Sequence, residues 1–376
     1  MILTTQVRLL PTQEQVVLLR STLERCNKAC SWISKQAIQA KTFHKVAIQK
    51  LLYGQIRHQF DLGAQATVRC IAKVADAHKV GRRSKPRRFR RFASQPFDAR
   101  LLSWKGDYVS IWTLNGRIKV PIKLNEHQKT LLKNRKGEVD LCLTKSGKWL
   151  LLVSYELQEQ PEQRENEFVG VDLGIVNLAT DSDGVTYSGD DVEQARRRYS
   201  HRRRNLQRKR TRSAKRKLKK ISGKEARFRR DVNHQISKAI VEKAQYTDKG
   251  IALEDLKGIR KRIKARRKQR SRLHSWSFHQ QRLFIAYKAK IVGVEVVYVN
   301  PAYTSQTCSQ CGFCSKENRP TRDKFICGNC CFYASADHNA ALNISFKARA
   351  AVNQPNGTLP GPKVAKTSSL ATSSIL

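Results

Sequence analysis

Two pairs of cysteines near the carboxyl end of the sequence limit most strongly how that part of the chain can fold. Cys308 and Cys311 are separated by two residues, as are Cys327 and Cys330, and fifteen residues lie between the two pairs. Two such pairs can supply four thiolates at ~2.3 Å from a tetrahedral zinc ion that is closed to water. The spacing therefore predicts a structural zinc ribbon over residues 303–333, a segment too short to hold a hydrophobic core of its own.

Two further cysteines leave the choice of zinc ligands open. Cys314 would allow a pair formed by Cys311 and Cys314, and Cys331 stands directly after the second pair. We favour Cys308 with Cys311 because Gly312 supplies the glycine that the turn of a zinc knuckle often needs. The second pair lacks that glycine, since Cys331 occupies its position.

The four remaining cysteines are scattered, and two of them lie close together in the sequence. Cys26 and Cys30 are four residues apart in a predicted helix and so share one face. No histidine or second cysteine pair lies near them in the sequence. We interpret them as small buried residues, with a second metal site as the alternative.

The charge of the chain indicates a polyanionic partner. The 376 residues include 74 Lys and Arg but only 30 Asp and Glu, which gives a formal net charge of +44. Repulsion on this scale destabilises a compact fold unless a polyanion neutralises it, and nucleic acid is the expected partner. The chain has no apolar run of 18 residues and does not begin with a signal-peptide pattern, so we expect a cytoplasmic protein without membrane contact.

The first half of the sequence predicts a β-barrel into which helices are inserted. Residues 2–9 have the composition of a strand, and Thr12 with Gln15 forms a capping-box pattern that opens a helical region. Short strands follow this region, including a hairpin turned by Asn115-Gly116. We expect a barrel from residues 1–10 and 85–160, with a helical domain at 11–84.

The second half predicts an α/β domain that the cysteine pairs interrupt. The run 168–174 is apolar, β-branched and bounded by glycine, which indicates a buried strand. Further strands are expected at 176–180, 184–188, 250–255 and 294–299, and a last helix is expected at 336–346. We assign residues 161–302 and 334–347 to this domain and 348–376 to a disordered tail rich in Pro, Gly, Ser and Thr.

Three carboxylates stand at the ends of these predicted elements. Asp172 lies in a hydrophobic strand, where an ionised carboxylate is costly without a metal or a partner. Glu254 ends another strand, and Asp337 begins the last helix. Each has an ordinary alternative role, as a turn residue, a strand-end residue or a helix N-terminal charge. Together at one sheet edge they would supply hard oxygen ligands for two Mg²⁺ ions ~4 Å apart, an arrangement that hydrolyses phosphodiesters.

Dense runs of basic residues indicate contacts with phosphate. Residues 196–230 contain 19 Lys or Arg and a single acid, Glu225. A solvated helix is the ordinary explanation, but like charges four residues apart destabilise a helix unless phosphates neutralise them. The run 81–92 has Phe89 and Phe92 between its cations, which would add base stacking to phosphate contact. The residues expected to bind nucleic acid, without assignment to RNA or DNA, are Arg82, Arg83, Lys85, Arg87, Arg88, Arg90, Arg196, Arg197, Arg202, Arg203, Arg208, Lys209, Arg210, Lys215 and Arg216.

Several of these runs together resemble the TnpB family, the transposon-encoded relatives of type V CRISPR effectors. The resemblance rests on GVDLG around Asp172, IALEDL around Glu254, and the segment from YTSQTCSQCG to CGNCCFYASADHNAALNI, which includes Asp337. It also includes residues 275–303 and the basic helices before Glu254, and it extends weakly to the first 40 residues. The missing glycine at Cys331 departs from the family pattern.

The resemblance implies an α+β multidomain protein with an RNase H-like (RuvC) α/β nuclease domain interrupted by a zinc ribbon. A β-barrel wedge domain with an inserted helical recognition domain would precede it. Asp172, Glu254 and Asp337 would be the RuvC triad that binds Mg²⁺, and the two cysteine pairs would hold one structural Zn²⁺. The implied partners are a guide RNA from the transposon end and target double-stranded DNA with a short motif that the protein reads, in the cytoplasm or nucleoid of a prokaryote.

Several functions are compatible with parts of this pattern. RNA-guided, Mg²⁺-dependent cleavage of double-stranded DNA by one site is the leading hypothesis. An RNA-guided repressor without nuclease activity would predict a substituted triad, whereas all three carboxylates are present. A DDE transposase or a transposition regulator would need a zinc-free core and its own end-recognition domain, and an actin-like ATP-binding fold explains neither the cysteine pairs nor the charge.

Overall fold

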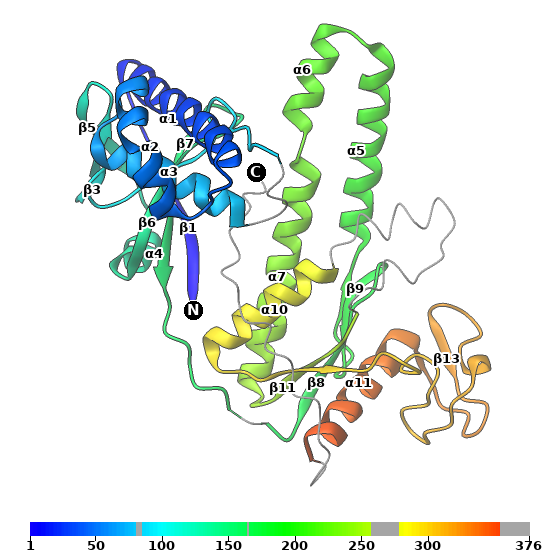
Figure 1. The fold of residues 1–376 in the computed structure, drawn as a ribbon. Helices are drawn as coiled ribbons and strands as arrows, with labels where there is room; N and C mark the ends of the chain where they lie inside the picture. The colour runs from blue at the N-terminus through cyan, green and yellow to red at the C-terminus, as the bar shows by residue number, and fades with distance from the viewer. Residues whose placement is uncertain (80–84, 164, 257–277, 354–376) are drawn as a thin grey trace. The chain divides into compact units, whose positions relative to one another are not determined.

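The computed structural model describes residues 1–79, 85–163, 165–256 and 278–353 (Figure 1). Within these residues the chain divides after Gln158 into two compact units, each of which is described by itself. The predicted tail beyond residue 353, the basic run 257–272, and Arg82 and Arg83 lie outside the described residues. No helix in the described ranges is long and apolar enough to cross a membrane.

The first unit contains a seven-stranded antiparallel sheet. Its strands are β1 (Ile2–Leu9), β2 (Gln95–Phe97), β3 (Leu102–Lys105), β4 (Tyr108–Thr113), β5 (Gly116–Lys123), β6 (Arg135–Leu143) and β7 (Trp149–Glu156), in the order β2-β6-β7-β1-β5-β4-β3. The hairpin predicted at Asn115-Gly116 is confirmed as β4–β5, and β6 pairs with β7 in the same antiparallel way. The sequence predicted a β-barrel from these strands, and the sheet is nearly closed, with its edge strands β2 and β3 consecutive in the chain but not paired.

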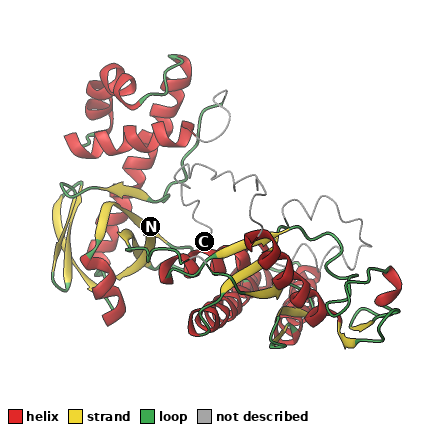
Figure 2. Ribbon diagram, turned by 90° about the horizontal axis from the view of Figure 1, so that it is seen from below, coloured by secondary structure: helices red, strands yellow, loops and turns green. Residues whose placement is uncertain are grey.

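Three helices separate β1 from β2 in this unit, and a short fourth helix follows β5. They are α1 (Gln13–Gln39), α2 (Lys45–Phe60), α3 (Ala64–Lys79) and α4 (Glu126–Lys133). In Figure 2 the strands of this unit lie together and the helices gather beside them. The predicted capping box is confirmed, since the Thr12 side chain accepts the Gln15 N–H and the Gln15 side chain accepts the Thr12 N–H.

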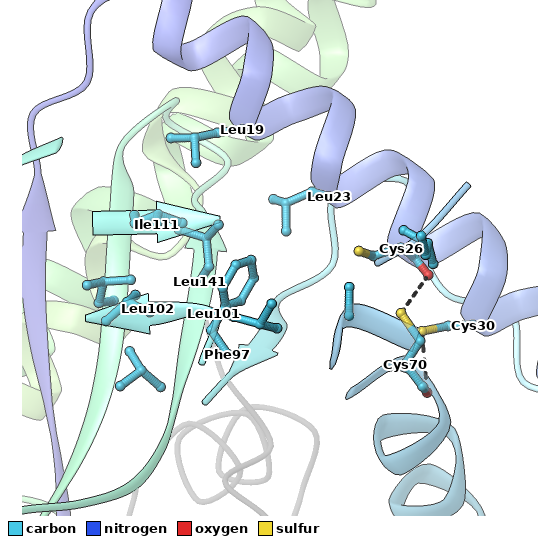
Figure 3. Close-up of a cluster of buried hydrophobic side chains, with 14 of the residues drawn as sticks. Leu19, Leu23, Cys26, Cys30, Cys70, Phe97, Leu101, Leu102, Ile111 and Leu141 are labelled. Carbon is cyan, nitrogen blue, oxygen red and sulfur yellow. Dashed lines mark hydrogen bonds between the residues drawn. The ribbon is translucent and has the colours of Figure 1, made fainter. Parts of the chain in front are cut away.

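Helices and sheet of the first unit share one hydrophobic core (Figure 3). Leu19 and Leu23 of α1 lie in this core with strand residues that include Phe97. The core also contains Cys26 and Cys30, and the fold brings Cys70 of α3 next to them. The Cys30 thiol contacts the Cys70 carbonyl at 3.8 Å, and the Cys70 thiol contacts the Cys26 carbonyl at 3.7 Å. These thiols are fully buried and serve as core residues, as predicted.

The second unit contains a five-stranded mixed sheet. Its strands are β8 (Phe168–Asp172), β9 (Asn177–Asp181), β10 (Thr186–Ser188), β11 (Gly250–Glu254) and β12 (Val296–Val299), in the order β10-β9-β8-β11-β12. The central strands β8, β11 and β12 are parallel, whereas β9 and β10 are antiparallel to their neighbours. Each strand was expected near its observed place.

Helices cover both faces of this sheet, which explains why its central strands are apolar without alternation. On one face Val169, Val171 and Leu253 share a core with α7 (Lys224–Tyr246) and α10 (Phe278–Val292). On the other face Phe168 and Ala252 pack against α11 (Ala336–Asn353). The helices α5 (Asp190–Lys209) and α6 (Arg212–Ile221) form a hairpin before α7 (Figure 1).

The last helix is longer than the sequence predicted. The predicted helix ended at residue 346, with a disordered tail from 348, but α11 continues to Asn353. Ala348 is buried and Val352 is half-buried against the strands, so the apolar contacts continue for two more turns. The start predicted for the tail was therefore wrong.

Candidate active site and zinc site

Two of the predicted catalytic carboxylates lie at adjacent strand ends. Asp172 is the last residue of β8, and Glu254 is the last residue of β11. The two strands are parallel, and their register places Val171 beside Leu253, one residue before each carboxylate. The carboxyl ends of β8 and β11 therefore bring Asp172 and Glu254 to the same edge of the sheet.

Close packing of α11 on β8 brings the third carboxylate to this edge. A Cβ atom on Gly170 would overlap the carbonyl oxygen of Ala341, so only glycine allows the helix to lie this close to the strand. Two residues earlier, the Ser345 hydroxyl donates to the carbonyl of Phe168 at 2.6 Å. From Gly170 back to Phe168 the strand covers two residues, or ~6.6 Å, while the contact on α11 moves forward from Ala341 to Ser345, four residues or ~6 Å. The helix and the strand therefore run antiparallel, with four helix residues for every two strand residues. The next step in this register pairs Asp337 with Asp172.

The environment of the edge favours protonated carboxyl groups when no cation is bound. Burial, followed by the charges of Glu254 and Asp337, raises the pKa of Asp172 from 3.8 to about 7, and Arg319 opposes the shift. Burial also raises the pKa of Glu254, while a hydrogen bond from Thr304 acts in the opposite direction. The negative charge gathered at this edge is therefore only partly offset by the nearby cations Arg319 and Lys347.

This donor set fits hard divalent cations. Carboxylate oxygens are the ligands that Mg²⁺ prefers, and bound cations would remove the repulsion that raises the pKa of Asp172.

Three polar residues that the sequence analysis did not single out complete the edge. Thr304 donates its hydroxyl to Glu254 Oε1 at 2.5 Å, and Asn177 donates its side-chain amide to Asp337 Oδ2 at 2.8 Å. Arg319 Nη2 lies 3.7 Å from Asp337 Oδ1. Thr304 belongs to the YTSQT run that carries the family resemblance, whereas no motif marks Asn177 or Arg319.

Two asparagines on α11 bind the chain that leads into the ribbon. Asn343 donates its amide to the carbonyl oxygens of Thr304 and Thr307 at 2.9 and 2.7 Å. One turn earlier, Asn339 donates to the Thr307 carbonyl at 2.8 Å and accepts the N–H of Ser309 at 3.0 Å. The helix that carries Asp337 therefore also fixes the residue that donates to Glu254.

The four predicted zinc ligands form one cluster. Their sulfur atoms all lie within 4.8 Å of one another, which among the described residues is the only such group of three or more candidate ligands. The Cys308 and Cys330 sulfurs are 3.7 Å apart, and the Cys311 and Cys327 sulfurs are 3.5 Å apart. A tetrahedral zinc–thiolate site has sulfur–sulfur edges of ~3.8 Å. The cluster fits a structural zinc ion, and Cys314 and Cys331 are not part of it.

The two knuckles have the same backbone geometry despite the missing glycine. Gly312 N–H donates to the Cys308 carbonyl, and Cys331 N–H donates to the Cys327 carbonyl, both at 3.0 Å. Gly312 has a φ angle of 76° and Cys331 one of 56°. A non-glycine residue in this left-handed region is strained, so the second knuckle keeps the family geometry at a cost in stability. The hairpin of β13 (Lys324–Ile326) and β14 (Tyr333–Ser335), after a 3-10 turn at Lys316–Asn318, completes the ribbon.

Some of the basic residues expected to bind nucleic acid form ion pairs within the chain, and others are exposed. In α5, Glu193 forms ion pairs with Arg196 and Arg197, and Glu225 forms one with Arg203. The remaining expected residues of α5 and α6 are exposed on the helical hairpin, and they are Arg202, Arg208, Lys209, Arg210, Lys215 and Arg216.

The expected basic segment of the first unit differs from its prediction in one respect. Lys85, Arg88 and Arg90 are exposed there, whereas Arg87 is half-buried. The rings of Phe89 and Phe92 are partly buried against the core, so they anchor the segment, and base stacking by them stays a prediction.

Two family models match the chain in succession. The model described as a probable transposase (OrfB of IS605) matches residues 152–259, and the model of the Cas12f1-like TNB domain matches residues 278–344. The first match includes Asp172 and Glu254, and the second includes Asp337 and both cysteine pairs. The TnpB-like protein MJ0751 of Methanocaldococcus jannaschii is 28% identical over 266 residues, which cover 66% of this chain and 94% of that protein.

These matches support the resemblance to the TnpB family over residues 152–344. The chain is also 30% identical over 218 residues to the putative RNA-guided DNA endonuclease InsQ of Escherichia coli K12, covering 53% of each chain. It is 33% identical over 221 residues to the CRISPR-associated endodeoxyribonuclease Cas12f1 of Sulfoacidibacillus thermotolerans, covering 54% of this chain and 51% of that one. The matches thus span about half the length of these two relatives.

Among solved structures, the Cas12f1–sgRNA–target DNA complex aligns with 92% of this chain and 99% of that chain, with 17% identity and a TM-score of 0.39.

Proposed function

We propose that this protein is an RNA-guided DNA endonuclease of the TnpB family. It binds a guide RNA derived from the transposon end, recognises a short motif beside the target and cleaves double-stranded DNA by metal-dependent hydrolysis. The observation that carries the proposal is the meeting of Asp172, Glu254 and Asp337 at one edge of the second unit's sheet. Relatives named as RNA-guided DNA endonuclease and as endodeoxyribonuclease support it.

In this proposal the three carboxylates hold two Mg²⁺ ions. When bound, such ions supply an activated water and stabilise the leaving 3′ oxygen of a phosphodiester. Asp172 gives up its carboxyl proton as cations bind, because its pKa of about 7 reflects burial and neighbouring negative charge. Thr304 orients the Glu254 carboxylate and Asn177 orients that of Asp337, each through the hydrogen bond it donates.

The ribbon contributes a cation to the same edge. The Arg319 guanidinium lies beside Asp337 and also donates to the Arg322 carbonyl, which limits its movement. Guanidinium groups bind phosphate oxygens through paired hydrogen bonds. We assign to Arg319 the binding of a substrate phosphate at this edge, and to the zinc ion a structural role in holding the ribbon that carries it.

The domain organisation follows from the same proposal. Parallel central strands, an antiparallel edge pair and helices on both faces support a RuvC-like, RNase H-like nuclease domain at 161–302 and 334–347, interrupted by the ribbon at 303–333. The nearly closed sheet at 1–10 and 85–160 would be the wedge domain, and the helices at 11–84 the recognition domain. Guide RNA and target DNA would neutralise the net charge of +44.

The substitution Glu254→Gln tests the proposal. It keeps the size of the side chain but removes a charged ligand, so we expect Mg²⁺-dependent cleavage to fall at least about a thousandfold. Co-purified RNA and the thermal midpoint should stay at wild-type values. Glu242→Gln on α7, which removes an exposed carboxylate that pairs with Lys238, is the matched control. Wild-type cleavage by Glu254→Gln would show that the triad assignment is wrong.

A further inference from the structure

A basic segment of the first unit, residues 85–93, lies along one face of α1 before the chain enters β2. It belongs to neither a helix nor a strand. Side-chain exposure alternates from residue 87 to residue 90 of this segment. Arg87 and Phe89 are half-buried, whereas Arg88 and Arg90 are exposed. A period of two residues is that of extended backbone, which places alternate side chains on opposite sides. We call residues 85–93 the α1-bound segment.

Hydroxyl groups of α1 hold the backbone of this segment. Ser34 Oγ accepts the N–H of Arg87 at 2.7 Å, and Ser31 Oγ accepts the N–H of Phe89 at 3.0 Å. Positions 31 and 34 lie on one face of the helix, so two successive inward N–H groups of the segment meet two successive serines. The path of the backbone is fixed by these uncharged side chains.

A second set of contacts fixes the end of the α1-bound segment. Asn27, one further step along the same face of α1, donates its amide to the Ala93 carbonyl at 2.9 Å. Lys73 of α3 donates to Asn27 Oδ1 at 2.7 Å and to the Ser94 carbonyl at 2.6 Å, and its ammonium lies 5.0 Å from the Phe89 ring centroid. The segment is therefore tied to both α1 and α3.

The outward side of the segment presents cations without internal partners. No carboxylate in the described part of the chain forms an ion pair with Lys85, Arg88 or Arg90. The neighbouring Arg91 differs, because its guanidinium lies 2.6 Å from a carboxylate oxygen of Glu24. Of the five cations of the segment, Lys85, Arg88 and Arg90 are exposed without such an ion pair, Arg91 is neutralised by Glu24, and Arg87 is half-buried.

We infer that the α1-bound segment is a pre-ordered binding surface for a phosphodiester backbone, with Lys85, Arg88 and Arg90 as the contacts and Ser31 and Ser34 as positioning residues. Alternate residues of an extended chain are ~6.6 Å apart, which lets Arg88 and Arg90 contact neighbouring phosphates of one strand. The aromatic rings face the core, so the surface reads the backbone rather than the bases. The choice of nucleic acid as the partner rests on the proposed function.

The fixed backbone of the α1-bound segment should strengthen binding beyond what its charges provide. A flexible basic segment must lose conformational freedom when it binds, whereas a segment held by α1 has already lost it on folding. Removing a serine hydroxyl should therefore weaken binding although no charge changes. The dependence of affinity on salt should stay the same, because it reports the number of phosphates contacted.

Binding of the full-length protein to two probes, a guide-length RNA and a DNA duplex, tests the contacts over a range of salt concentrations. For Arg88→Ala with Arg90→Ala we expect affinity for at least one probe to fall about tenfold or more. The slope of log affinity against log salt should fall by about 1.4 to 1.8, the loss of two phosphate contacts. Arg91→Ala, whose charge Glu24 already neutralises, should change affinity less. The probe that responds identifies RNA or DNA as the source of the phosphates.

Ser31→Ala tests the positioning role. We expect faster hydrogen exchange at the Phe89 amide and an affinity about threefold to fivefold lower at an unchanged salt slope. Ser31→Thr keeps the hydroxyl and should restore both values. Ser21→Ala is the matched control, since the Ser21 hydroxyl contacts the Leu18 carbonyl of its own helix.

Four outcomes distinguish failure of the inference from failure of the proposed function. An unchanged affinity and slope in the double arginine variant would show that the segment does not contact phosphate. Faster exchange at Phe89 with unchanged affinity would show that pre-ordering does not matter. Loss of RNA-guided cleavage in a protein that passes both tests would refute the proposed function alone, and a wild-type protein that binds neither probe would refute both.

Discussion

The carboxylate edge and the zinc ribbon of the second unit both supply metal ligands in the proposed function, but they are assembled in different ways. The ribbon takes its four ligands from 23 consecutive residues, Cys308 to Cys330, whose turns bring the sulfurs together. The edge takes its three ligands from two strands and a helix that are far apart in the sequence. In the proposed function the ribbon therefore needs its zinc ion in order to fold. The carboxylates of the edge, by contrast, form a cation site only because the folded sheet and helix bring them together.

This difference determines what the loss of each metal should do. The ribbon has only a small core around Phe325, so zinc supplies much of its stability. The edge lies on a packed sheet, and its carboxylates repel one another when no cation is present. Removing the ribbon's metal should damage structure and activity together, while removing the edge's metal should stop chemistry and leave the fold intact.

The largest expected effect follows from removing a zinc ligand. Cys308→Ser should lower the zinc content by about one ion per chain and reduce thermal stability and cleavage together. Metal analysis, thermal unfolding and a cleavage assay on the same preparation measure the three quantities. Cys314→Ser removes a thiol outside the cluster and should leave all three at wild-type values. A zinc-free Cys308→Ser protein that remained folded and active would contradict the contrast between the two regions.

A large effect on stability and cleavage is also expected when α11 is displaced from β8 while all three carboxylates are kept. Gly170→Ala would force α11 away from β8, which should destabilise the protein by about 2 kcal/mol or more and move Asp337 from Asp172. Cleavage should fall more than stability explains, and zinc content should not change. Gly54→Ala in α2, where no atom lies within 4 Å of the added carbon, is the control and should stabilise by up to about 1 kcal/mol. Unchanged cleavage by Gly170→Ala would show that the packing of α11 does not position Asp337.

A change of pH should have a moderate effect on stability and on cation binding, and this effect should arise at the carboxylate edge. The pKa of Asp172 in the metal-free fold is about 7, against an ordinary value of 3.8, so between these values the folded protein holds one more proton than the unfolded chain. Its contribution to stability without divalent cations therefore falls as pH rises from about 4 to 7.

Divalent cations must displace the same proton, so their apparent affinity should rise about fivefold from pH 6 to pH 7 and by at most about twofold more above that. Mn²⁺ binding followed by electron paramagnetic resonance measures this affinity. Asp172→Asn should flatten the profile. A flat profile in the wild-type protein would contradict the charge repulsion inferred for the edge.

The smallest effect concerns the missing glycine of the second knuckle. Cys331 has a left-handed backbone, so Cys331→Gly should relieve strain and stabilise the zinc-bound ribbon by about 1 kcal/mol. Gly312→Ala at the equivalent position of the first knuckle should destabilise it by a similar amount. Thermal unfolding with excess zinc measures both variants, and a destabilised Cys331→Gly protein would point to an unrecognised contact of the Cys331 thiol.

Features fixed by neighbours in the sequence could be predicted from the sequence alone. The spacing of the cysteine pairs gave the zinc cluster, and the capping box at Thr12 gave the start of α1. Asp172 and Glu254 could be chosen because an acid at the end of an apolar strand needs a partner. Each of these signals lies within about twenty residues of chain.

Features that depend on tertiary packing could not be predicted in this way. Arg319 reaches Asp337 from the linker between the two knuckles, and Asn177 does so from a neighbouring strand, so neither carries a local signal. The end of α11 was placed too early because residues 348–353 were grouped with the tail rich in Pro, Gly, Ser and Thr, whereas Ala348 is buried against the sheet. The inward direction of Phe89 depends on the serines of α1, which are more than fifty residues away in the sequence.

The most direct measurement of the central claim compares two guides on one plasmid library. The protein is assembled with two RNAs that differ only in their terminal targeting segment, and the cut sites are sequenced. We expect each guide to direct cleavage to its own matching DNA beside a shared short motif, with mismatches near the motif blocking cleavage most. Glu254→Gln assembled with either guide should bind but not cut. The same cut site with both guides, or unchanged cleavage after RNase treatment before assembly, would contradict RNA guidance.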